Sequence, residues 1–149
     1  MSSLVPTLEF VATLTGTLFA GAALYINVAE HPARMSLETQ MAALQWAPSY
    51  QRATWLQAPL ALLSLISGVT AWLLGAGIGW LIAALLVGAV VPFTFAVIMP
   101  TNNKLLTPGR DLSSTETRAL LVRWGRLHAV RTILSMVGVT LYLLLLLGA

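Results

Sequence analysis

The sequence predicts an all-α integral membrane protein, an up-down bundle of four helices with short amphipathic helices on the cytoplasmic side. The composition is 58% hydrophobic and 9% charged, far from the usage of soluble domains. Between Arg52 and Lys104 there is no charged residue, and that stretch is long enough for two spans of about 20 residues each. All eight Lys and Arg residues lie in the segments 34–52 and 104–131. A two-span hairpin between these segments places every basic residue on one face of the membrane.

Four apolar segments supply the spans, and turn residues separate them. The glycines of Gly75-Ala76-Gly77-Ile78-Gly79 predict a tight reversal, because glycine accepts the positive φ angles of short turns. Pro100 is expected to stop the third span, since proline has no backbone N–H to donate. Short connections favour antiparallel neighbours. The predicted spans of a single domain, 1–149, are roughly 5–27, 54–74, 80–99 and 127–147.

The two basic segments carry helix signals of their own. Ser36 is expected to cap a short amphipathic helix over 37–46, which Pro48 should end. In the second basic segment, Ser113-x-x-Glu116 has the pattern of a capping box. At about 100° per residue, a helix that starts here continues into the fourth span without a break. Its inward side then carries Leu121, Trp124, His128 and Arg131, while Arg118, Arg123 and Arg126 face solvent.

The distribution of charge also predicts the orientation. The positive-inside rule places the basic segments in the cytoplasm, with both termini and the glycine turn outside the cell (inner) membrane. The lipid bilayer is the expected partner and nucleic acid is not, because the basic residues serve as topology signals and lipid-phosphate contacts. The lack of cysteine excludes disulfides and thiolate metal sites. Ala12, Gly16 and Ala20 form a small-residue face, which favours packing inside the bundle, with a homodimer as the alternative.

Polar and aromatic residues gather at one end of all four spans. In an antiparallel bundle the end of the first span, the start of the second, the end of the third and the start of the fourth share one level. We therefore expect these residues to surround a single pocket at the cytoplasmic mouth of the bundle. The simpler alternative for each residue alone is an aromatic belt, a helix cap or a lipid contact. The set is Asn27, Glu30, His31, Arg34, Trp46, Tyr50, Arg52, Trp55, Gln57, Thr101, Asn102, Trp124, His128 and Arg131.

Four motifs in this set resemble those of a known family. They are Asn27-x-x-Glu30-His31-Pro32-x-Arg34, Gln45-Trp46-x-x-Ser49-Tyr50-x-Arg52, Met99-Pro100-Thr101-Asn102-Asn103-x-Leu105 and Trp124-x-x-Leu127-His128-x-x-Arg131. In this order, over nearly the whole chain, they resemble the anthrone oxygenase-like membrane family. The resemblance implies a four-span bundle. It also implies the activity of some fungal members, which oxidise anthrones to anthraquinones without a conventional cofactor.

This chemistry assigns expected roles to the residues. An anthrone has an acidic methylene between two aryl rings, and loss of one proton gives an electron-rich anion that reacts with O₂. Such an enzyme needs a base, a cation for the oxyanion and an aromatic-lined slot. His128 is the first candidate base and His31 the second, and Arg131 or Arg34 would hold the oxyanion. The expected substrate-binding residues are Asn27, Glu30, Trp46, Tyr50, Arg52, Trp55, Gln57, Thr101, Asn102 and Trp124.

Three other functions would use the same residues or their neighbours. A haem- or quinone-linked redox protein would use His31 and His128 as axial ligands, or as metal ligands with Glu30. No third His and no Cys supports such a site, so no cofactor or metal is expected. A small four-span transporter would use the carboxylate of Glu9 in the first span. A non-catalytic membrane subunit is the remaining alternative.

Overall fold

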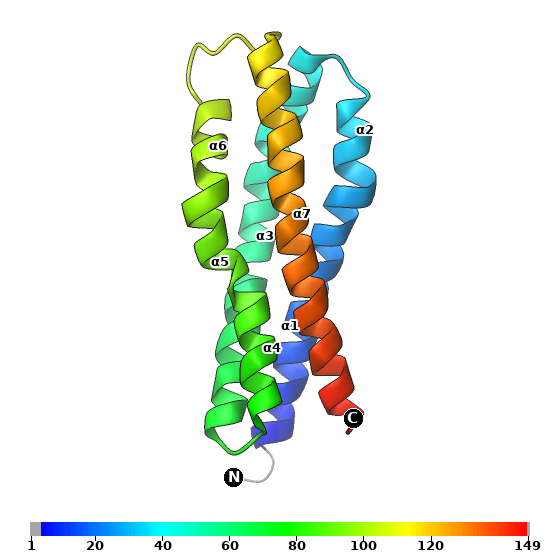
Figure 1. The fold of residues 1–149 in the computed structure, drawn as a ribbon, viewed down its shortest axis with the longest axis vertical. Coiled ribbons are helices and arrows are strands. Elements are labelled where there is room, and N and C mark those ends of the chain that lie inside the picture. The colour runs from blue at the N-terminus through cyan, green and yellow to red at the C-terminus, as the bar shows by residue number, and fades with distance from the viewer. Residues whose placement is uncertain (1–3, 149) are drawn as a thin grey trace.

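The computed structural model describes residues 4–148, in which the chain forms four helical rods along one axis and no strand (Figure 1). The elements are α1 (Leu4–Tyr25), η1 (Ile26–Glu30), α2 (His31–Met35), α3 (Thr39–Leu73), α4 (Ile78–Gly88), α5 (Val90–Phe93), η2 (Thr94–Ile98), α6 (Met99–Leu105) and α7 (Thr115–Leu146), where η marks a π-helical segment. The rods Leu4–Met35, Thr39–Leu73, Ile78–Leu105 and Thr115–Leu146 are each long and apolar enough to cross a membrane. The predicted all-α four-helix fold is confirmed.

The rods alternate in direction. Figure 1 shows both termini and the α3–α4 turn at one end of the molecule, which we call the turn end. The opposite end, which carries Arg34, Arg52 and the basic residues of 104–126, is the basic end. Around the bundle, α1 and α4 each pack on α3 and α7. At the turn end Gly75 has a φ of +104°, and the Ala76 N–H donates to the carbonyl of Ala71 at 3.0 Å, as in a glycine-capped reversal.

Small residues let the helices approach closely in the turn half of the bundle. Ala12, Gly16 and Ala20 are buried, and a Cβ added at Gly16 would lie 2.8 Å from the Ser64 hydroxyl. The Ser64 hydroxyl donates to the carbonyl of Ala12 at 2.9 Å, and Tyr142 donates to the carbonyl of Ser64 at 3.2 Å. The small-residue face therefore packs inside the bundle.

Two of the rods contain a π-helical turn that is followed closely by a proline. Pro32 comes just after η1 and Pro100 just after η2. A proline removes one backbone N–H, and its ring crowds the carbonyl four residues earlier, so the turn before it widens. The third rod nevertheless continues through α6 to Leu105, and the expectation that Pro100 ends it is wrong. Near Pro92 the same rod breaks between α4 and α5.

The second rod is longer than the span expected from the sequence. α3 passes through Pro48 and Pro59, so the segment 37–46 is helical from Thr39 but is not a separate helix. Both prolines are exposed on the outside of the bundle. Each removes one backbone donor, which does not end a helix whose other side is held by tertiary packing. The expectation that Pro48 ends a short helix capped by Ser36 is therefore wrong.

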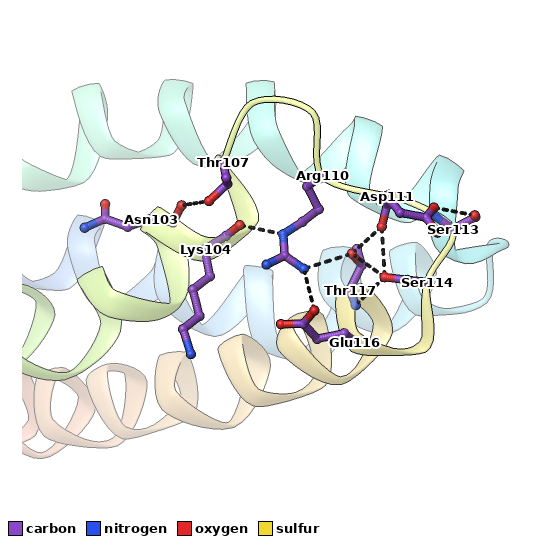
Figure 2. Close-up of polar contacts among 9 residues, drawn as sticks. All are labelled: Asn103, Lys104, Thr107, Arg110, Asp111, Ser113, Ser114, Glu116 and Thr117. Carbon is purple, nitrogen blue, oxygen red and sulfur yellow. Dashed lines mark hydrogen bonds and ion pairs between the residues drawn. The ribbon is translucent and has the colours of Figure 1, made fainter.

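The loop before α7 is ordered by its own polar side chains (Figure 2). Ser114 is the N-cap of α7, and its hydroxyl accepts a hydrogen bond from the Thr117 N–H at 3.2 Å. The cap therefore lies one residue after the predicted Ser113. Ser113 instead donates to the Asp111 carboxylate, from its hydroxyl at 2.6 Å and its N–H at 2.9 Å, and these bonds lower the pKa of Asp111. From its cap α7 runs unbroken into the fourth span, as predicted.

The arginines of α7 divide largely as expected. Arg123 and Arg126 are exposed. Arg118 is half-buried, because its guanidinium donates to the carbonyl of Leu37 at 3.0 Å and to that of Met35. Carbonyls at a helix C-terminus have no partner within their own helix, so Arg118 stabilises the end of α2 and ties it to α7.

Candidate functional site

A cavity lies between the rods at the level of Gln57 and Arg131, which are near the middle of α3 and α7. Its volume of about 120 Å³ is several times the roughly 10–15 Å³ that one water needs. All four rods contribute to its wall. The lining residues are Phe19, Ile26, Glu30, Arg34, Ser49, Tyr50, Ala53, Thr54, Gln57, Ala58, Ala61, Val90, Val91, Thr94, Phe95, Met99, Trp124, His128 and Arg131.

His128 is held in one orientation by Asn27 on η1. The Asn27 amide nitrogen donates to the carbonyl of Gly125 at 3.2 Å, which identifies the other amide atom as the oxygen. That oxygen accepts from the Thr132 hydroxyl at 2.5 Å and lies 2.8 Å from Nδ1 of His128. Nδ1 must then carry the ring proton, and Nε2 is the basic nitrogen. Nε2 has no hydrogen-bond partner among residues 4–148, and His128 lines the cavity.

Arg131 brings a cation to the same cavity, one turn further along α7. Its Nη2 donates to the amide oxygen of Gln57 at 3.0 Å, and its guanidinium lies 5.5 Å from the centre of the Phe19 ring. Its Nε is buried without a partner in the described chain. An arginine at this depth needs a partner, for which the sequence favours Glu30 or the neutral Asn102; this expectation is wrong, because Gln57 is the partner. Arg131 therefore brings a positive charge, paired with a neutral amide, to the cavity wall that also carries His128.

Arg34 is fully engaged by its neighbours, although it also borders the cavity. Its guanidinium donates to Glu30, to Gln45, to the Ser49 hydroxyl at 3.2 Å and to Nδ1 of His31 at 3.3 Å. Glu30 also accepts a hydrogen bond from Ser49. The Arg34 side chain is 1% exposed and that of Glu30 is 23% exposed. This network fastens η1 and α2 to α3, and it leaves Arg34 little capacity to bind a further anion.

An aromatic cluster backs the polar groups. The Trp124 ring packs against both histidines, with ring centres 5.2 Å from His31 and 4.9 Å from His128. Trp46 meets Trp124 edge-on at 5.9 Å and stacks on Tyr50 at 5.1 Å with nearly parallel planes. Tyr50, Trp124 and His128 line the cavity, whereas Trp46 and His31 pack behind them. A flat aromatic molecule would thus meet rigid, aromatic walls.

The structure brings together half of the residues that the sequence assigned to the site. Those that line the cavity are Glu30, Arg34, Tyr50, Gln57, Trp124, His128 and Arg131. Asn27, His31 and Trp46 contact lining residues without reaching the cavity themselves. Arg52 and Trp55 are exposed, with Trp55 at 78%. Thr101 and Asn102 are buried on α6 and do not line the cavity.

Comparison with known proteins places this arrangement in a family. The sequence pattern of the family described as anthrone oxygenase matches residues 46–141. The chain belongs to the anthrone oxygenase family. Anthrone oxygenase tpcL of Aspergillus fumigatus is 32% identical over 140 residues, which cover 87% of each chain. Anthrone oxygenase ptaC of Pestalotiopsis fici is 32% identical over 120 residues, 68% of this chain and 82% of the relative. No solved structure matches the chain.

Several lining residues of this anthrone oxygenase homologue were missed from the sequence because they are apolar or weakly polar. On α3 they are Ala53, Thr54, Ala58 and Ala61, which recur with Tyr50 and Gln57 at intervals of three and four residues. This spacing marks one face of a helix, so it could have been read from the sequence once Gln57 was assigned to the site. On the third rod they are Val90, Val91, Thr94, Phe95 and Met99. They also recur at intervals of three and four residues, but none of them was assigned to the site, so the sequence offered no residue from which to extend this face.

The residues of this homologue do not fit a haem or metal held by His31 and His128. Trp124 packs against both imidazoles. Nδ1 of His31 accepts from Arg34, and its Nε2 packs on Gly125 so closely that a Cβ there would lie 2.4 Å away. Neither nitrogen of His31 is thus directed at space for a metal ion. Among residues 4–148 no three His, Cys, Asp or Glu side chains are grouped as ligands.

Proposed function

We propose that this protein oxidises a flat, lipophilic phenol of the anthrone type with O₂, converting a ring methylene to a ketone. One observation carries the proposal. A correctly oriented neutral imidazole, that of His128, and a guanidinium that is paired with a neutral amide, that of Arg131, line one aromatic-walled cavity. The relatives that support it are named anthrone oxygenases. A general base and a fixed cation are the two groups that formation of a carbanion conjugated with a carbonyl requires.

The steps balance without a further reactant. Nε2 of His128 takes one proton from the methylene, and Arg131 stabilises the negative charge that moves to the carbonyl oxygen. The electron-rich carbon gives electrons to O₂, a C–O bond forms, and the peroxide takes up a proton. The second C–H proton is then lost as the O–O bond breaks, which leaves a ketone and one water. In sum, R₂CH₂ and O₂ become R₂C=O and H₂O, with the substrate oxidised and oxygen reduced.

Turnover of 1,8-dihydroxyanthrone by the purified protein in detergent micelles tests the assignment. Product absorbance and oxygen consumption are measured against a blank, because anthrones also oxidise slowly alone. Since general bases contribute about 10²–10⁴-fold, we expect His128→Ala to lower kcat at least about 100-fold. Arg131→Ala should lower it comparably, whereas Arg123→Ala, an exposed arginine on the same helix, should not change it. Full activity in both cavity variants would refute the proposal.

We also infer that the bundle spans the cell (inner) membrane with the basic end in the cytoplasm. The four apolar rods and the absence of basic residues at the turn end support this orientation. The chain has no cysteine, so a single introduced thiol reports one position. A membrane-impermeant maleimide added to intact cells should label Gly77→Cys at the turn end and not Ser114→Cys at the basic end. The reverse pattern would overturn the orientation.

A further inference from the structure

The cavity reaches the surface at the side of the bundle. Three of its lining residues are exposed: Thr54 and Ala58 on α3, and Phe95 on η2. The remaining lining residues are buried or half-buried, including those near the basic end such as Arg34 and Glu30. The exposed members of a cavity wall mark its mouth. The mouth therefore lies between α3 and η2, on the flank of the molecule.

The shape of the third rod explains why the bundle is open there. α4 packs against both α3 and α7, so the turn half of the molecule is closed. Beyond the break at Ala89, η2 and α6 keep their contacts with α7, whereas α3 makes few contacts with this part of the rod. Phe95 lies in the π-helical turn η2 and is 66% exposed. The second and third rods therefore pack closely at the turn end and separate at the level of the cavity.

The surface around the mouth is suited to hydrocarbon. Leu62 on α3, one turn beyond Ala58, is exposed, and no charged residue occurs between Arg52 and Lys104. The one polar group of the mouth, the Thr54 hydroxyl, donates to the carbonyl of Tyr50 at 2.9 Å. Its hydrogen-bonding demand is met within the helix, so it does not require water. Nothing polar at the mouth opposes the passage of an apolar molecule.

We propose that the cavity takes its ligand laterally from the bilayer, through an opening bounded by Ala58 and Phe95. The ligand is an uncharged, flat, lipophilic molecule dissolved in the hydrocarbon or interfacial layer; that it is then oxidised rests on the proposed function. The opening admits molecules that partition into lipid and are narrow enough to pass. His128 and Arg131 therefore contact only molecules that have already left water. A large side chain at Ala58 narrows the route without touching either of these groups.

Reaction of a thiol inside the cavity tests the route without relying on turnover. Ala61 is 1% exposed and lines the cavity, so the thiol of Ala61→Cys can be reached only from inside it. In nanodiscs, we expect N-phenylmaleimide, which partitions into lipid, to label this thiol at least tenfold faster than a sulfonated maleimide, which stays in water. Adding Ala58→Trp should slow the apolar reagent at least tenfold. Adding Ala96→Trp, an exposed position on η2 outside the cavity wall, should not.

The outcomes separate this proposal from the proposed function. Faster labelling by the sulfonated reagent, or no effect of Ala58→Trp, would overturn lateral access and assign an aqueous route. If neither maleimide labels the thiol in the native protein, but both label it after denaturation, lateral access is also refuted. Labelling as expected, together with no oxidation of 1,8-dihydroxyanthrone, would keep the lateral route and refute the oxygenase activity. Oxidation that Ala58→Trp slows in nanodiscs would support both.

Discussion

Replacing Asn27 with alanine should reduce turnover without weakening substrate binding. The Asn27 side chain accepts from Nδ1 of His128 and does not line the cavity, so it acts through the histidine. His128 is 1% exposed, and Asn27→Ala leaves its Nδ1–H buried without an acceptor. An orphaned buried donor costs about 1–3 kcal/mol. If the ring escapes this cost by moving its proton or turning over, Nε2 is no longer the basic nitrogen in the cavity.

The expected effect follows from that free energy. At about 1.36 kcal/mol per factor of ten, a loss of 1–3 kcal/mol in the reactive orientation lowers kcat roughly 5- to 150-fold. KM should remain within about twofold, because no group that faces the substrate is removed. Steady-state kinetics with 1,8-dihydroxyanthrone over a range of concentrations separates the two constants. Thermal unfolding of the same samples in detergent shows how much of the change is loss of folded protein.

Thr132→Val is the matched control. Thr132 donates to the same oxygen of Asn27, and its removal leaves the bond to His128 in place. Both variants remove a buried hydrogen bond, so both should lower the unfolding temperature, but only Asn27→Ala should lower kcat by more than about threefold. If kcat falls no further in Asn27→Ala than in Thr132→Val, Asn27 does not orient a catalytic imidazole.

Three further substitutions test the interactions that support the site. Glu30→Ala should destabilise the fold by about 3 kcal/mol in chemical denaturation, the lower end of the range for a broken buried ion pair, because Arg34 is buried and Glu30 is partly exposed. Gly125→Ala should cost about 1–3 kcal/mol and lower the unfolding temperature, since its Cβ would lie 2.4 Å from His31; an unchanged temperature would contradict this close contact. Ser114→Ala should cost about 1 kcal/mol and speed amide exchange in the first turn of α7; slow exchange there would show that another group caps the helix.

The arrangement of the rods was predictable because a few strong signals agree. The uncharged stretch after Arg52 and the glycines at 75–79 give the number of helices and their directions. The helix ends were less predictable. Pro48 and Pro100 are strong breakers in isolation, but each removes only one backbone donor. In the folded bundle the surrounding helix is held by its neighbours, and tertiary packing outweighs the local preference.

The sequence predicts that residues of all four rods meet near one level, but it does not predict the direction of each side chain. Residues from the ends of four spans come to one level because successive antiparallel rods of similar length start and end at the same two levels. Which of them turn inward depends on helix phase. Trp55 and Gln57 are two residues apart on α3, so they face in widely different directions, and only Gln57 is buried. The sequence favours the carboxylate of Glu30 as the partner of Arg131, whereas the structure pairs Arg131 with the neutral amide of Gln57.

The π-helical turns make the two halves of the bundle separately adjustable. Each such turn contains one residue more than a regular helix would use, so it shifts the angular register of everything after it by about 100°. Close packing can therefore fix the orientation of the small-residue face of α1. The directions of the Asn27 and Glu30 side chains, which come after that face, follow a different angular register. A substitution in the half that contains the cavity therefore needs no compensating substitution in the turn half. A chain built in this way can change what it binds and keep the stability of its scaffold.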